Sequence, residues 1–167
     1  CVFQTEEAVK YFSDKLIGRH TIIDNPVCEN VSPSLQIHDN GVNKIVTVGR
    51  YAEQKNYYFL IDVFCLFKAK HPDFILECYG KDSGEYKRIN QYIIDKGMED
   101  CILLKRETPY IHNCIVSAKA FLFTPFFEGA PNALMEAAAI GLPCVASDLP
   151  EIRSINHPNP FAILCPL

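Results

Sequence analysis

The chain has 167 residues and a formal net charge of −4. Its hydrophobic fraction of 49% is enough to bury one sizeable core and excludes a disordered chain. The acidic balance excludes the overall positive field of a typical nucleic-acid-binding protein, so no nucleic-acid partner is expected.

The first 24 residues differ from the rest and are expected to be the end of a neighbouring domain. Residues 1–3 are apolar, as at the end of a strand, and a helix over 6–17 and a short strand over 20–24 are predicted next. Residues 25–43 are polar and turn-rich, which predicts a linker. The start has neither a Met nor a signal-peptide pattern, and we expect the chain to be cut from a longer protein.

From residue 44 onward, apolar strands alternate with amphipathic helices. The predicted strands are 44–50, 73–80, 101–105, 120–125, 143–147 and 161–165. The predicted helices are 56–71, 83–97 with Ser83 as N-cap, 109–119 with Pro109 first, one from Pro131 to Gly141, and a short helix or turn over 150–156. This alternation predicts an α/β fold, a Rossmann-like doubly wound parallel sheet of about six strands.

Eight cysteines and five histidines raise the question of a metal or disulfide site. No C-x-x-C pair and no Cys/His cluster with ligand spacing occurs, and the scattered histidines are expected at the surface. Half of the cysteines lie in or beside predicted strands, where a thiol packs as a small hydrophobe: Cys78, Cys101, Cys144 and Cys165. We therefore expect reduced thiols, a cytoplasmic protein and no metal.

The longest apolar run extends from Tyr57 to Phe67 and is interrupted by Asp62. It is too short to span a bilayer, so no transmembrane segment is expected in this chain.

Candidate ligand-binding residues follow the first predicted strand. Ligands of open α/β sheets bind at the carboxyl ends of the strands, and here Gly49 and Arg50 are followed by Lys55. The glycine allows a close backbone approach, and two cations suit a diphosphate. By itself the pattern also fits a solvated loop with two incidental charges, because neither glycine-rich phosphate fingerprint is present.

Two carboxylates, Glu128 and Glu136, flank the start of an alanine-rich helix. With Pro131 in its first turn, this helix would present a positive dipole end that favours phosphate, with free N–H groups around Gly129, Ala130 and Asn132. Carboxylates accept hydrogen bonds from vicinal hydroxyls, so the pair predicts two polyols, a ribose and a sugar, on either side of that phosphate. Taken singly, Glu128 also fits a capping residue and Glu136 a solvated one.

The stretch FEGAPNALMEAAAIGLPCVASDLPEI resembles the nucleotide-binding signature of retaining glycosyltransferases of the GT-B fold, family 4 (glycosyl transferases group 1). The family pattern is E-G-x-P-x-x-x-x-E-A-x-A-x-G-x-P-V-V-A-S, and Glu128 and Glu136 match its two glutamates. VGRYAEQKN resembles the family's G-R-x-x-x-x-K-N motif. The resemblance covers about residues 44–165. It implies a remnant of an N-terminal domain over 1–24, an interdomain linker over 25–43, and a C-terminally truncated nucleotide-sugar-binding domain over 44–167.

The resemblance also implies roles for single residues. Arg50 and Lys55 would neutralise the donor diphosphate and, with Glu128 at the donor sugar, carry catalysis. Glu136 would hold the ribose hydroxyls. The remaining contacts would come from Gly49, Gly129, Ala130, Pro131 and Asn132 around the sugar and phosphate, and from Arg106 and Thr108 at the base. No metal or cofactor is implied, because the cations and the helix end neutralise the charge.

The expected function is that of the donor-binding half of a hexosyl- or N-acetylhexosaminyltransferase in polysaccharide biosynthesis. It would move a sugar from a nucleotide sugar, in first place a UDP-sugar, to an acceptor glycan or lipid-linked glycan with retention, in the cytoplasm or at the inner face of the membrane. Lacking the acceptor domain, the chain is expected to be inactive alone. Alternatives are a GDP-mannose-dependent mannosyltransferase and a non-catalytic nucleotide-sugar-binding module. A dehydrogenase half is disfavoured, because no G-x-G-x-x-G follows the first strand.

Overall fold

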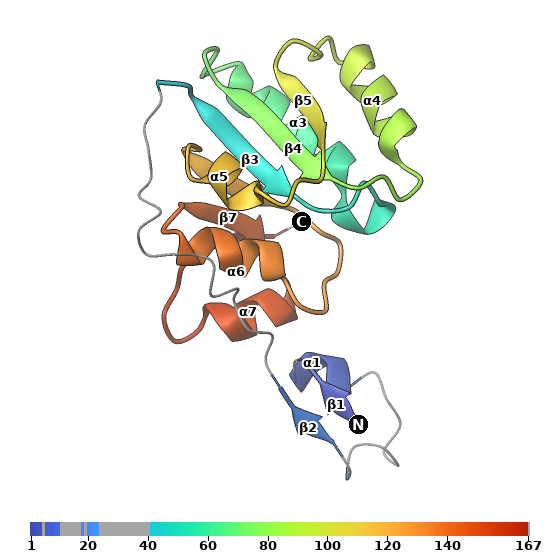
Figure 1. Ribbon diagram of the computed structural model, residues 1–167, viewed down its shortest axis with the longest axis vertical. Helices are drawn as coiled ribbons and strands as arrows, with labels where there is room; N and C mark the ends of the chain where they lie inside the picture. Colours follow the sequence, from blue (N-terminus) through green and yellow to red (C-terminus); the bar gives the residue numbers. More distant parts are fainter. Residues whose placement is uncertain (5, 11–17, 19, 24–40, 167) are drawn as a thin grey trace.

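A six-stranded parallel sheet organises most of the chain (Figure 1). The computed structural model describes residues 1–4, 6–10, 18, 20–23 and 41–166. The strands of this sheet are β3 (Lys44–Val48), β4 (Ile75–Gly80), β5 (Ile102–Arg106), β6 (Ala120–Phe123), β7 (Cys144–Ser147) and β8 (Ala162–Cys165). Their spatial order is β5-β4-β3-β6-β7-β8, and each neighbouring pair is parallel. The predicted doubly wound α/β fold is confirmed, with the strand order of a Rossmann sheet.

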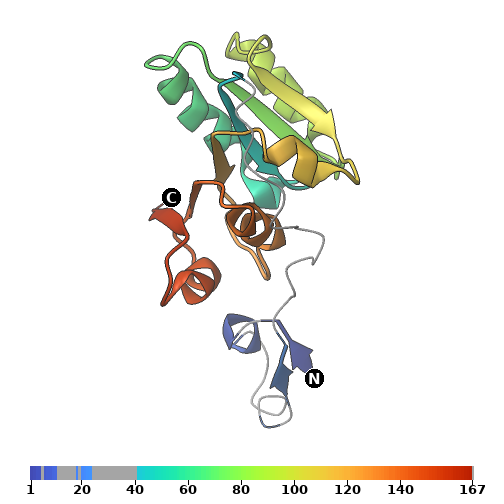
Figure 2. The same ribbon diagram turned by 60° about the vertical axis from the view of Figure 1, so that its left-hand side comes forward.

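Helices cover both faces of this sheet (Figures 1 and 2). One face carries α3 (Tyr57–Lys68) and α4 (Tyr86–Asp95), and the other carries α5 (Ile111–Ile115), α6 (Asn132–Ala139) and α7 (Pro150–Asn156). A 3₁₀ turn, η1 (Glu53–Lys55), lies between β3 and α3. β5 is the edge strand of the sheet, and the next strand, β6, lies beside β3. The chain therefore crosses back over the sheet after β5, and the helices from α5 onward cover the opposite face.

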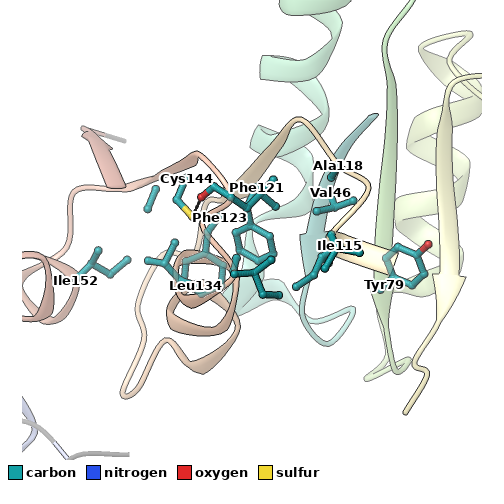
Figure 3. Close-up of a cluster of buried hydrophobic side chains, with 14 residues drawn as sticks. Val46, Tyr79, Ile115, Ala118, Phe121, Phe123, Leu134, Cys144 and Ile152 are labelled. Carbon is teal, nitrogen blue, oxygen red and sulfur yellow. Dashed lines mark hydrogen bonds between the residues drawn. The ribbon is translucent and has the colours of Figure 1, made fainter. Parts of the chain in front are cut away.

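Two apolar clusters follow from the alternation of side chains along the buried strands. In β3, Ile45 packs with α3 and α4, whereas the next residue, Val46, packs toward α5 and α6. Figure 3 shows the second cluster, in which the aromatic rings of Phe121 and Phe123 lie beside Leu134 of α6. Apolar clusters therefore lie on both faces of the sheet, as the near-continuous apolar strands predict.

The turn after α6 has the geometry that the sequence predicts. Gly141 has a φ of +86°, a conformation that favours glycine. Its N–H donates to the carbonyl of Ala138 (2.8 Å), and the N–H of Leu142 donates to that of Ala137 (3.1 Å). These two bonds form a Schellman motif, which ends the helix and directs the chain into β7.

Three local predictions are wrong. Ser83 does not cap α4, because the Asp82 carboxylate accepts hydrogen bonds from the N–H groups of Gly84 (2.8 Å) and Tyr86 (3.1 Å). Pro109 lies in a turn ahead of α5, which is shorter than the predicted 109–119 because it begins only at Ile111. The N–H of Asn132 is not free, since it donates to the carbonyl of Ala130 (2.9 Å).

The N-terminal segment contains a small parallel pair of strands. β1 (Val2–Phe3) pairs with β2 (Thr21–Ile22), and α1 (Glu6–Val9) follows β1. The later part of the predicted helix, 11–17, and most of the predicted linker, 25–40, lie outside the described residues. The proposed boundaries at residues 24 and 43 therefore stay predictions.

Candidate functional site

The site lies where β3 and β6 end side by side. At this point the chain proceeds from β3 toward β4 on one side, while the later strands extend from β6 on the other. Ligands of doubly wound sheets bind in the crevice outside the carboxyl ends of the strands at such a switch point. The predicted cationic residues follow β3, and the predicted Glu128 follows β6, so the fold brings these two segments together.

The two strand ends β3 and β4 approach each other closely. A Cβ atom on Gly80 would lie 2.0 Å from the carbonyl oxygen of Gly49, a distance that no side chain tolerates. The N–H of Gly49 donates to the carbonyl of Tyr79 (2.9 Å), which extends the strand pairing by one residue. Glycine at position 80 is therefore required to bring the loop containing Arg50 against the end of β4.

Lys55 and Glu128 form a largely buried ion pair across the switch point. Their side chains are only 15% and 11% exposed, and the Lys55 ammonium also lies 5.1 Å from the centre of the Phe123 ring. Two further hydrogen bonds connect the loops. The side-chain amide of Gln54 donates to the carbonyl of Phe127 (2.9 Å), and the backbone carbonyl of Gln54 accepts from the N–H of Phe126 (2.9 Å). The cation and the carboxylate that the motifs single out are thus held in one place.

A cavity of about 210 Å³ lies between these loops and the start of α6. It includes seven of the predicted site residues, Gly49, Arg50, Lys55, Glu128, Ala130, Pro131 and Asn132. Gly129 is not among its lining residues, although it lies in the same loop. A ring of two cations, one carboxylate and a helix start suits an anion that carries a polyol.

The cavity continues along the carboxyl edge of the sheet. It shares Gly49 and Arg50 with a second cavity of about 190 Å³, which is lined further on by Thr108. The second shares Gly80, Lys81 and Glu107 with a third cavity of about 560 Å³, and Arg106 lines that third cavity. We call this row of three adjoining cavities the trough. Thr108 and Arg106 line its β4–β5 end, and the predicted phosphate-binding residues line its other end.

Glu136 faces α5 and is not among the lining residues of the 210 Å³ cavity. Its carboxylate lies 3.4 Å from Nε2 of His112, and the two side chains are 27% and 18% exposed. The prediction that all histidines are ordinary surface or loop residues is therefore wrong for His112. A signal in the sequence was its place in the helix that follows the predicted base-binding segment, but the pairing with Glu136 depends on how α5 and α6 pack.

A buried carboxylate on β4 was not predicted at all. Glu77 contacts the ammonium groups of Lys44 (3.0 Å) and Lys105 (2.6 Å) and accepts a hydrogen bond from the Tyr79 hydroxyl (2.8 Å). Burial raises the pKa of Glu77, but the bonds from Lys105, Tyr79 and Lys44 outweigh burial and bring the pKa below its ordinary value. Glu77 is thus a charged group inside the sheet, held by its partners.

The described part of the chain contains no cluster of three or more His, Cys, Asp or Glu side chains that could hold a metal ion. The seven cysteines described there are free thiols, and burial raises the pKa of Cys144 to about 12. Among the helices that the structure describes, none is both long enough and apolar enough to cross a membrane.

The strand order and the cavity at the switch point define a Rossmann-like α/β domain with a candidate ligand site at the carboxyl edge of its sheet. Residues 34–166 match the model of the family described as glycosyl transferases group 1. The chain therefore belongs to this family.

Known relatives agree with this assignment. An uncharacterised glycosyltransferase of Methanocaldococcus jannaschii is 30% identical over 122 residues, which make up 72% of this chain and 28% of that protein. The amylovoran biosynthesis glycosyltransferase AmsK of Erwinia amylovora is 30% identical over 131 residues, or 74% of this chain and 32% of AmsK. The chain thus spans less than a third of the length of these relatives.

A solved structure confirms the type of fold. Anabaena HepE, crystallised in complex with UDP-glucose, is similar to this chain with a TM-score of 0.81 at 16% sequence identity. The similarity covers 99% of this chain and 49% of the HepE chain. The six-stranded parallel sheet is therefore of the GT-B glycosyltransferase type.

Proposed function

We propose that this chain is the donor-binding domain of a retaining, family 4 glycosyltransferase that uses a nucleotide diphosphate sugar. The observation that carries the proposal is the single cavity around Arg50, Lys55, Glu128 and the start of α6. It offers cations for a diphosphate and a carboxylate for sugar hydroxyls at one point of the sheet edge.

In this proposal the diphosphate lies against Arg50, Lys55 and the first turn of α6. When the bond from the sugar to the diphosphate breaks, negative charge grows on the leaving phosphate. Two cations and a helix start that are already in place stabilise that charge without having to reorganise. For this reason we propose that the domain needs no dedicated metal ion.

Glu128 would contact the donor sugar, which places the reacting carbon of the sugar beside the diphosphate. Its partner Lys55 orients the carboxylate, because the two side chains form a nearly buried ion pair. Ala130 and Pro131 line the same cavity and would shape the sugar and phosphate region, with Gly129 in the same loop.

The nucleoside would extend along the trough toward β5. Glu136 would hold the ribose hydroxyls, and Thr108 and Arg106 would meet the base, since they line the next two cavities. A UDP-sugar is the donor we propose, because HepE has been crystallised with UDP-glucose in a fold of the same type. A hexose or an N-acetylhexosamine is the sugar we expect.

We further propose that the acceptor, a glycan or a lipid-linked glycan, binds to a different domain of the complete protein. A role in polysaccharide biosynthesis accords with AmsK, which is an amylovoran biosynthesis glycosyltransferase.

Isothermal titration calorimetry of the chain with UDP, GDP and ADP tests the proposal. We expect UDP to bind most tightly, with the same affinity in EDTA, and Lys55→Ala to weaken UDP binding about tenfold or more, because a charge-assisted contact is lost. Lys70→Ala is the matched control. It removes an exposed lysine beyond α3, away from the carboxyl ends of the strands, and it should leave the affinity unchanged.

The alternatives predict different results. A preference for GDP would favour a mannosyltransferase, and UDP binding without transfer by the complete protein would favour a non-catalytic module. Failure of all three nucleotides to bind, or equal effects of Lys55→Ala and Lys70→Ala, would contradict the proposed site.

A further inference from the structure

A histidine of α5 and a carboxylate of α6 face each other. Nε2 of His112 lies 3.4 Å from a carboxylate oxygen of Glu136. This Nε2 atom is buried and has no hydrogen-bond partner among the described residues, so its hydrogen-bonding capacity is unused at that distance. Buried polar atoms without partners are rare and call for an explanation.

The two side chains differ in how they meet the solvent. Glu136 is the more exposed of the pair, at 27% against 18% for His112, whose Nε2 is fully covered. Glu136 is therefore the member of the pair with more surface available to a ligand, whereas the Nε2 atom of His112 is not directly available.

The position of His112 is fixed by its short helix. Ile111, Cys114 and Ile115 of α5 pack into the apolar cluster of Figure 3. The ammonium of Lys44 donates to the carbonyl of Cys114 (3.1 Å) and is itself held by the buried Glu77 (3.0 Å). These contacts fix the backbone of α5, from which the imidazole extends toward Glu136.

We propose that His112 is a positioning residue for Glu136: its Nε2–H fixes the carboxylate in the orientation that accepts the vicinal hydroxyls of the donor ribose. The inference rests on the proposed function, in which Glu136 holds that ribose. Contacts of this kind are commonly long in unliganded proteins and shorten when the ligand binds. A second group that orients the contacting one is also the usual way to hold a ligating side chain in a productive geometry.

Calorimetry with UDP and its 2′-deoxy and 3′-deoxy analogues tests the inference. We expect Glu136→Ala and His112→Ala each to weaken UDP binding about tenfold, and His112→Ala to cost less than about twofold when Glu136 is already Ala. His112→Gln keeps an N–H donor at similar reach and should bind UDP within about threefold of the unchanged chain. His71→Ala, on an exposed histidine before β4, is the control and should have no effect.

The deoxy analogues separate positioning from a purely structural role. Each analogue lacks one of the two hydroxyls that Glu136 holds, so His112→Ala should weaken the binding of the analogues by a smaller factor than it weakens the binding of UDP. A loss that is equal for UDP and both analogues would overturn the inference, as would no loss for His112→Ala or additive losses in the double variant. If the unchanged chain does not bind UDP at all, the proposed function fails first, and this inference fails with it.

Discussion

Gly80 is the residue at which the close contact between strand ends is most severe. An added Cβ would meet the backbone carbonyl of Gly49 at 2.0 Å, and a backbone atom cannot move aside as a flexible side chain can. We expect Gly80→Ala to lower the free energy of unfolding by about 2 kcal/mol or more, because the strands must separate. Urea denaturation measures this change.

Gly129→Ala is the matched control for that experiment. A Cβ on Gly129 would meet nothing within 4 Å, and its φ is not in the left-handed region. Its stability should stay within about 0.5 kcal/mol of the unchanged chain, or rise slightly through a less flexible unfolded state. Equal stabilities of the two alanine variants would show that β3 and β4 do not approach as described.

Glu77 gives a second prediction for a single residue. Its pKa is lower in the folded chain than its ordinary value of 4.5, so its contribution to stability is complete above that value and is lost as the pH falls through the folded pKa. Glu77→Gln leaves Lys44 largely buried without its counter-charge and should cost about 3 kcal/mol near neutral pH. The variant should also lose less stability than the unchanged chain as the solution is acidified.

Urea denaturation of both proteins from about pH 7 to about pH 3 gives the required comparison. Asp62 and Asp148 also have lowered pKa values, through Lys96 and Arg153 respectively, and they contribute to both curves equally. The difference between the curves therefore isolates Glu77. A constant difference across the whole range would contradict the role assigned to its charge.

At the level of elements, the start of α4 depends on one side chain. Asp82 accepts hydrogen bonds from two N–H groups of the turn that leads into the helix, whereas Ser83, the residue expected to cap it, makes no such bond. We expect Asp82→Ala to cost about 1 kcal/mol of stability and Ser83→Ala less than about 0.3 kcal/mol. Thermal unfolding of the two variants measures these losses of stability. A larger loss for Ser83→Ala than for Asp82→Ala would show that Ser83 caps the helix.

The accuracy of a predicted helix boundary depends on the length of the helix. For α3 and α4 the apolar period and the flanking residues locate a helix within a few residues of its observed ends. The five residues of α5 are too few to be stable alone, and contacts with the sheet decide where this helix begins and ends. Pro109 therefore marked a turn and not a helix start.

The whole molecule leads to a prediction about activity. The groups that we assign to the donor all lie along one edge of one sheet, and we propose that the acceptor is bound by another domain. The chain should therefore bind UDP but show no transfer from UDP-glucose or UDP-N-acetylglucosamine to a glycan acceptor. A radiolabelled transfer assay that compares this chain with the complete protein measures this. Turnover by the chain alone would contradict the proposal that the acceptor binds to another domain.

The sequence alone determined the α/β class and the approximate strands, and it singled out seven of the residues that line the cavity at the switch point. Strand and helix periodicity are local properties, and the spacing of Glu128 and Glu136 and of Arg50 and Lys55 can be read along the chain. The prediction of a six-stranded doubly wound sheet is confirmed for this reason. The roles of the site residues stay predictions until ligand binding is measured.

Only the tertiary structure decided which of these residues touch. Lys55 meets Glu128 because β3 and β6, far apart in sequence, are neighbours in the sheet. Glu136 meets His112 because α5 and α6 pack on the same face of the sheet, and Glu77 meets Lys44 and Lys105 because β4 lies between β3 and β5. Such contacts depend on strand order and on how helices pack across it, and these follow from the burial of the whole apolar surface and not from any local pattern.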